Sequence, residues 1–114
     1  MKNNIKLDVS STPFFLKQAK ILKKKYSSFD KDLDKIKESL QINPFQGTSL
    51  GNNCYKIRFA IDSKGKGKSG GARLITLVKI IENKILLLSV YDKSIQDTIS
   101  DREIINILNE LKIL

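Results

Sequence analysis

The middle of the chain contains three apolar segments in close succession, and this stretch limits the fold more than any other. Tyr55–Ile61 alternates apolar with mainly basic side chains, whereas Ala72–Ile81 and Ile85–Tyr91 are apolar almost throughout. Alternation with a period of two indicates a half-buried strand, and continuous apolar runs of this length favour central strands. A Lys/Gly loop at 63–71 and a turn at 82–84 separate the segments. We therefore predict an antiparallel meander whose first strand has one basic face.

One further strand and three helices are expected around this meander. Ile5–Val9 alternates like a strand, and the pattern from Pro13 to Tyr26 predicts a helix that Thr12 can cap. A second helix should start at Phe29 and end near Asn43, because the residue before Pro44 resists helical geometry. The very short turn between the two helices predicts an antiparallel helical hairpin.

A capping box at Ser100–Glu103 opens a last helix, so the expected order is β-α-α-β-β-β-α. We predict an α+β fold in which the helical hairpin packs on one face of a mainly antiparallel sheet of three or four strands. The other face of the sheet should stay partly open. The 114 residues fit one domain, 1–114.

Composition limits the possible partners and compartments. A net charge of +9 favours an anionic partner such as RNA, DNA, an acidic membrane surface or an acidic protein, although compositional bias of a genome gives similar values. The single cysteine, Cys54, cannot form an internal disulfide and favours a reducing cytoplasm. The absence of long apolar runs argues against a membrane span. The absence of histidine excludes histidine-based catalysis and histidine metal sites, and we expect no metal or cofactor.

Four basic residues stand out in or beside the predicted sheet. Lys56 and Arg58 share one face of their strand, about 7 Å apart. They could equally be a solvated face that discourages edge pairing. Arg73 interrupts an otherwise apolar strand, so it either snorkels to solvent or joins this basic face. Lys93 follows the last strand and can reach the same face.

The Lys/Gly loop at 63–71 contains the Gly-Lys-Ser of a phosphate-binding P-loop. The match fails because the required glycine five positions before Gly67 is Asp62, and because a strand follows instead of a helix. We interpret the loop as a mobile basic hairpin that can contact a phosphate backbone, with a flexible solvated turn as the alternative. Its lysines are Lys64, Lys66 and Lys68.

Several motifs together resemble the RelE/ParE superfamily of bacterial toxins. Cys54–Arg58, Gly71–Ile75 and Leu88–Lys93 resemble the family core in order and spacing. Gly67–Arg73 resembles the segment that precedes the central strand in a RelE-like subgroup, and Asn43–Pro44 followed by a glycine resembles the usual break between hairpin and sheet. The resemblance covers nearly the whole chain and agrees with the predicted order of elements.

The resemblance implies a toxin of a type II toxin–antitoxin system that cleaves mRNA in the ribosomal A site and has a cognate antitoxin as partner. The family's catalytic positions are basic residues of the open sheet face, and they carry over to Lys56, Arg58, Arg73 and Lys93. RNA is cut when its own 2′-OH attacks the adjacent phosphate, which requires a base, charge stabilisation and an acid. A lysine amine among other cations releases its proton more readily, which makes Lys56 our candidate base.

In this scheme Arg58 and Arg73 stabilise the phosphorane, and Lys93 holds the phosphate or assists the leaving group. Lys56 and Arg58 could exchange their roles. Some relatives carry a tyrosine near the start of the final segment, but residues 96–99 contain none. We therefore expect Tyr91 to stack on a base. Separately, we expect the loop residues Lys64, Lys66 and Lys68 to bind RNA.

Two other functions remain open at this stage. A ParE-like toxin would inhibit DNA gyrase by binding the protein, and would not need convergent cations. A non-catalytic nucleic-acid-binding module would share the charge without requiring a specific set of residues. The combination of Lys56, Arg58 and Arg73 favours the endoribonuclease.

Overall fold

The computed structural model describes residues 7–96 and 98–113, and the start of the predicted first strand at Ile5 lies outside these residues. The elements are β1 (Asp8–Ser11), α1 (Pro13–Lys25), α2 (Phe29–Ile42), β2 (Thr48–Gly51), β3 (Cys54–Phe59), the one-turn helix α3 (Gly67–Gly70), β4 (Ala72–Lys79), β5 (Lys84–Asp92) and α4 (Asp101–Glu110), with 3₁₀ turns at Asp62–Lys64 and Ile80–Glu82. The described helices include none that is long and apolar enough to span a membrane.

The sheet has the strand order β1-β5-β4-β3-β2. All neighbouring strands are antiparallel except β1 and β5, which run parallel. The predicted α+β class, helical hairpin and antiparallel meander are confirmed. The described part of the sheet has five strands, whereas we predicted three or four. The additional strand, β2, is short and mostly exposed, so it lacks the apolar alternation that signals a strand.

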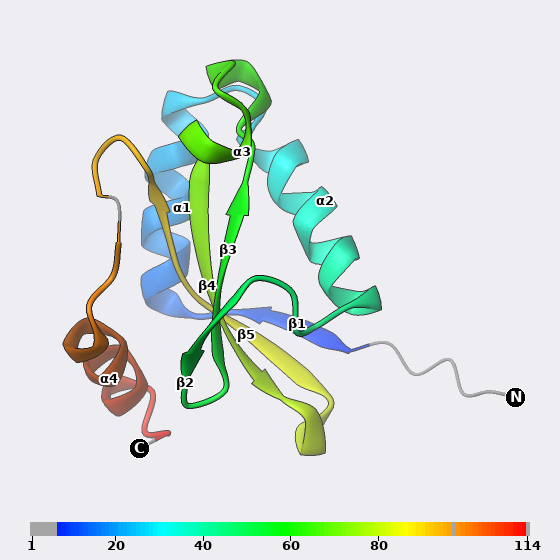
Figure 1. Cartoon of the computed structure of the whole chain (residues 1–114), viewed down its shortest axis with the longest axis vertical. Helices are drawn as coiled ribbons and strands as arrows, with labels where there is room; N and C mark the ends of the chain where they lie inside the picture. The colour runs from blue at the N-terminus through cyan, green and yellow to red at the C-terminus, as the bar shows by residue number, and fades with distance from the viewer. Residues whose placement is uncertain (1–6, 97, 114) are drawn as a thin grey trace, which may run out of the picture.

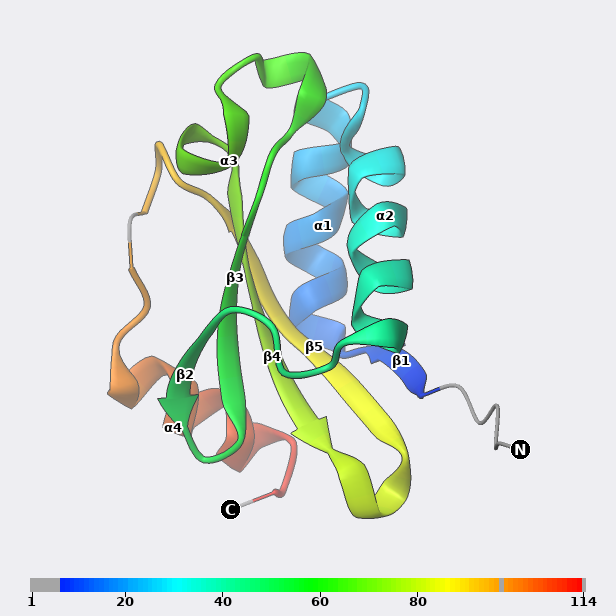
Figure 2. The same ribbon diagram turned by 45° about the vertical axis from the view of Figure 1, so that its right-hand side comes forward.

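The helical hairpin of α1 and α2 covers one face of the sheet, as Figure 2 shows. Apolar stripes of both helices pack there on the inward side chains of β3, β4 and β5. Phe15 and Phe29 are at most 1% exposed, and burial of each such side chain stabilises the fold by about 1.5–3 kcal/mol. The second helix ends at Ile42, as the following Asn43–Pro44 predicts.

The opposite face is covered over only part of its area. Helix α4 packs there on a second apolar cluster that includes Ile75, Leu77 and Leu88. The short helix α3 lies at the other end of the sheet (Figure 1). The predicted capping box of Ser100 and Glu103 begins α4, and the predicted cap Thr12 begins α1. Thr12 also donates a hydrogen bond of 2.7 Å to the Leu87 carbonyl, which ties the start of α1 to the sheet.

Gly71 joins α3 to β4 where the loop passes close to the backbone of β3. A Cβ atom at Gly71 would overlap the carbonyl oxygen of Phe59 and lie 2.9 Å from Cα of Ala60. We expect Gly71→Ala to lower the free energy of unfolding by about 2–3 kcal/mol, because backbone atoms cannot move aside as a side chain can. Urea denaturation measures this loss.

Gly65→Ala is the matched control for this prediction. Gly65 also lies in the loop, with φ +72° and no atom within 4 Å of an added Cβ. Gly65→Ala should therefore lower the free energy of unfolding only by the cost of placing alanine in the left-handed backbone conformation, about 1 kcal/mol. Equal losses in the two variants would show that the close approach at Gly71 does not matter.

Candidate active site

Strand register brings the predicted site residues together on the face opposite the helical hairpin. Arg58 of β3 pairs with Arg73 of β4, and Arg73 pairs with Tyr91 of β5. In the next row on this face, Lys56 pairs with Ile75. Neighbouring strands lie about 4.8 Å apart, so long side chains from these rows reach a common ligand. The predicted placement of Lys56 and Arg58 on one face beside Arg73 therefore agrees with the register.

Lys56 and Arg58 remain available to a ligand. The Arg58 side chain is exposed and Lys56 is half-buried. Within residues 7–96 and 98–113, no carboxylate forms a salt bridge with either of them. Two uncompensated cations on one strand face repel each other, and an anion bound between them relieves this repulsion.

Lys93 follows β5 directly, next to the start of β4. Its backbone N–H donates a hydrogen bond of 3.1 Å to the Gly71 carbonyl, which continues the pairing of β4 and β5 beyond Asp92. The Asp92 carboxylate contacts Tyr26 and Lys25 on the hairpin side. Lys93 itself lies in the turn that follows β5, and its side chain is exposed.

Arg73 differs from the other cations because it is buried, with 2% of its surface exposed. Its guanidinium donates hydrogen bonds to the carbonyls of Lys68 (3.1 Å), Ser69 (3.0 Å) and Ala72 (3.2 Å). We expected Arg73 on a solvent-open face, but helix α3 lies over it. The sequence does not show this, because the acceptors are backbone carbonyls that every residue type provides.

The Lys/Gly loop is folded, and its first lysine is not free. Lys64 forms a salt bridge of 2.6 Å with Asp92, and the side chains of the two residues are 11% and 2% exposed. The predicted phosphate contact of Lys64 therefore does not fit this arrangement. Lys66 and Lys68 are exposed and remain candidates for binding RNA.

Asp92 is the residue of this region that the sequence analysis missed. Its carboxylate accepts hydrogen bonds from Lys64, from the hydroxyl of Tyr26 (2.5 Å) and from the amide and hydroxyl of Ser94 (2.9 and 2.8 Å). Burial by itself would raise the pKa of this carboxyl. The hydrogen bonds of Lys64, Tyr26 and Ser94 outweigh burial and hold the pKa well below its usual range. The only sequence signal was an acidic residue at the end of an apolar strand.

Tyr91 cannot stack on an RNA base in this arrangement. It is 5% exposed and belongs to the apolar cluster under α4, together with Ile99 and Ile104. Its sequence position, at the end of the strand and beside Lys93, suggested an accessible ring. This burial depends on how the segment that carries Ile99 and Ile104 folds back onto the sheet.

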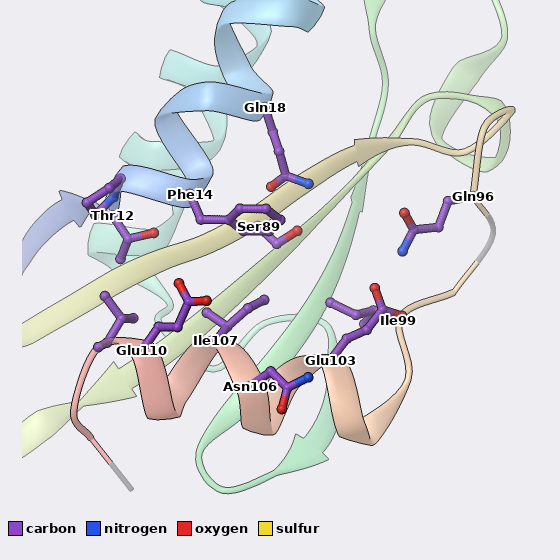
Figure 3. Close-up of a pocket in the computed structure, with 12 residues that line it drawn as sticks. Thr12, Phe14, Gln18, Ser89, Gln96, Ile99, Glu103, Asn106, Ile107 and Glu110 are labelled. Atoms are coloured by element: carbon purple, nitrogen blue, oxygen red, sulfur yellow. The ribbon is translucent and has the colours of Figure 1, made fainter.

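A groove of about 350 Å³ lies between the start of α1, β5 and α4 (Figure 3). Glu103, Glu110 and Asn106 of α4 line it, together with Phe14 and Gln18 of α1. None of its lining residues is Lys or Arg, so the groove has no charge that favours phosphate. Cys54 is also unsuited to catalysis, because burial raises the pKa of its thiol to about 11. The described residues contain no cluster of ligands suited to a metal ion.

Comparison with known proteins identifies the family. No curated protein sequence matches the chain at significant similarity. The fold is similar to that of a mutant of the E. coli toxin RelE in the free state, with a TM-score of 0.57, 17% sequence identity, and coverage of 82% of this chain and 90% of that chain. The sequence profile described as the RelE toxin of the RelE/RelB toxin–antitoxin system matches residues 14–112. This match spans all strands except β1 and all the described helices apart from the first residue of α1, and the chain therefore belongs to the RelE family of type II toxins.

Proposed function

We propose that this toxin is a ribosome-dependent endoribonuclease that cleaves mRNA. The observation that supports the proposal is a set of three cations: Lys56 and Arg58 on consecutive rows of one sheet face, and the exposed Lys93 directly after β5. None of them has a carboxylate partner within the described residues. Such a set suits a phosphodiester, whose negative charge increases in the transition state of cleavage.

The proposed reaction uses the RNA itself as nucleophile. Lys56 accepts the proton of the 2′-OH while the 2′-oxygen bonds to the adjacent phosphorus. Arg58 stabilises the charge of the phosphorane, and the bond to the 5′-oxygen breaks. Lys93 donates a proton to this oxygen or holds the phosphate, and a 2′,3′-cyclic phosphate remains. General acid–base steps of this kind contribute typically 10²–10⁴-fold each.

The RelE family implies an antitoxin as partner, and we propose that an acidic or amphipathic segment of the antitoxin neutralises the basic face. The net charge of +9 favours such a segment. Ribosomes and mRNA would be the other partners, which places the proposed activity in the cytoplasm.

The decisive experiment incubates the purified chain with ribosomes that translate a defined mRNA. Primer extension should reveal new 5′ ends at the A-site codon, and the upstream fragments should carry 2′,3′-cyclic phosphates. The inactive control is the double variant Arg58→Gln/Lys93→Gln. Intact mRNA with the wild-type protein would refute the proposal, and inhibition of DNA gyrase in the same preparation would then identify a ParE-like activity.

A further inference from the structure

We infer that Arg73 is a positioning residue, which holds the loop between β3 and β4 so that Lys66 and Lys68 bind RNA phosphates beside the cleavage site. This inference rests on the proposed function and concerns how the substrate is held. The Arg73 guanidinium contacts the carbonyls of Lys68 and Ser69 at 3.1 and 3.0 Å. Its cross-strand partner is Arg58, so the loop lies next to the proposed site.

The guanidinium of Arg73 has the surroundings of a structural side chain: it is buried and hydrogen-bonded to the backbone. Within the described part of the chain, no carboxylate forms a salt bridge with its guanidinium, although Arg73 is only 2% exposed. A buried guanidinium is stable only when its donors are satisfied, and here three backbone carbonyls accept its hydrogen bonds. A direct contact of these donors with phosphate would therefore require the loop to move away first.

The start of the loop is held by other residues. Lys64 is bound to Asp92. The backbone amide of Asp62 donates 2.9 Å to the Asp32 carboxylate, and that of Ser63 donates 2.7 Å to the Ser28 hydroxyl. In the second half of the loop, Arg73 holds the carbonyls of Lys68 and Ser69.

The two lysines of this second half are exposed, and no described carboxylate forms a salt bridge with them. Helix α3, which carries Lys68, packs against β3, the strand of Lys56 and Arg58. A loop that is ordered before binding loses less conformational freedom when it meets the RNA. Arg73 would thus increase RNA affinity through Lys66 and Lys68 without touching the phosphate.

The test is a double-mutant cycle of Arg73→Gln with Lys66→Gln/Lys68→Gln, measured as single-turnover cleavage on programmed ribosomes. We expect Arg73→Gln to raise the half-saturating concentration about tenfold and to change the maximal rate less than about threefold. Arg73→Gln should also make RNA affinity less dependent on salt. The slope of log affinity against log salt concentration should fall by roughly 1.5, about as much as when both lysines are lost. In the background without the two lysines, Arg73→Gln should then have almost no further effect.

A fall of the maximal rate by two to three orders of magnitude that persists without the two lysines would overturn the inference, since a direct phosphorane contact behaves in this way. A second measurement does not depend on cleavage. Amide order parameters at positions 66–70 of the free protein should drop below about 0.6 in Arg73→Gln and stay near 0.85 in α1. If the wild type does not cleave mRNA, this drop together with the lower salt slope of RNA binding still supports the positioning role, and an unchanged loop refutes it.

If Arg73→Gln does not fold, Arg73→Lys replaces it in the same measurements. A lysine keeps the charge and the apolar stem, but its single ammonium cannot match the fork that spans the two loop carbonyls. We expect an intermediate change of the half-saturating concentration and of the loop order parameters. Wild-type values for both quantities would contradict the inference.

Discussion

Lys56→Ala lowers the rate of mRNA cleavage on ribosomes by two to four orders of magnitude, while folding is largely retained. The expected loss follows from the role of Lys56 as the proposed base, because general base catalysis contributes about 10²–10⁴-fold. Lys56 is half-buried on β3 and forms no salt bridge within the described residues. Removal of its side chain therefore breaks no ion pair of the fold. Single-turnover cleavage and circular dichroism measure the two quantities.

Two further variants separate the base from a simple charge. Lys56→Arg keeps the positive charge, but a guanidinium does not release its proton in proteins, so the rate should remain low. Recovery of most of the activity in Lys56→Arg would show that the charge alone matters. Lys17→Ala removes an exposed lysine from α1, which packs on the other face of the sheet, and should leave the rate unchanged.

Asp92→Asn should lower the free energy of unfolding by about 3 kcal/mol. The carboxylate of Asp92 is 2% exposed and pairs with Lys64, which is 11% exposed, so the substitution leaves a largely buried ammonium without its counter-charge. Loss of one partner of a buried ion pair typically costs 3–5 kcal/mol. Urea denaturation at pH 7 measures the change.

The matched control is Asp30→Asn on α2. Asp30 pairs with Lys23 at 3.1 Å, but both side chains are more than half exposed. Exposed pairs contribute about 0–1 kcal/mol, so this variant should stay close to the wild type. Equal stability losses in Asp92→Asn and Asp30→Asn would show that burial does not strengthen the Asp92 pair.

The pH dependence of stability gives an independent check on Asp92. Its pKa is lower in the folded chain than in the unfolded chain, where aspartate titrates near about 3.9. The stabilisation by Asp92 is therefore complete above about pH 5 and is lost as the pH falls towards the folded pKa. The stability difference between wild type and Asp92→Asn should be constant from pH 5 to 8 and shrink below pH 4. A difference that grows in acid would contradict this assignment.

The elements of this fold depend on local patterns, and the sequence alone was sufficient to predict most of them. The alternation of residues 55–61, the cap at Thr12 and the capping box at Ser100 act within a few residues. A period of two also places Lys56 and Arg58 on one face, whatever the rest of the chain does. The short strand β2 was missed because its pairing depends on the turn at Asn52 and Asn53, both with positive φ, and not on an apolar pattern.

The chemical state of the site depends on contacts between segments that are distant in the chain. Lys64 and Asp92 are 28 residues apart, and their pairing removes a cation that the sequence assigned to RNA. Tyr91 is buried in an apolar cluster with Ile99 and Ile104, and the fold of the loop directs Arg73 to backbone carbonyls. Sequence by itself determined which cations share the sheet face, because strand geometry is local. Only the tertiary structure decided which of them remain free for an anion, because burial and ion pairing arise when distant segments pack together.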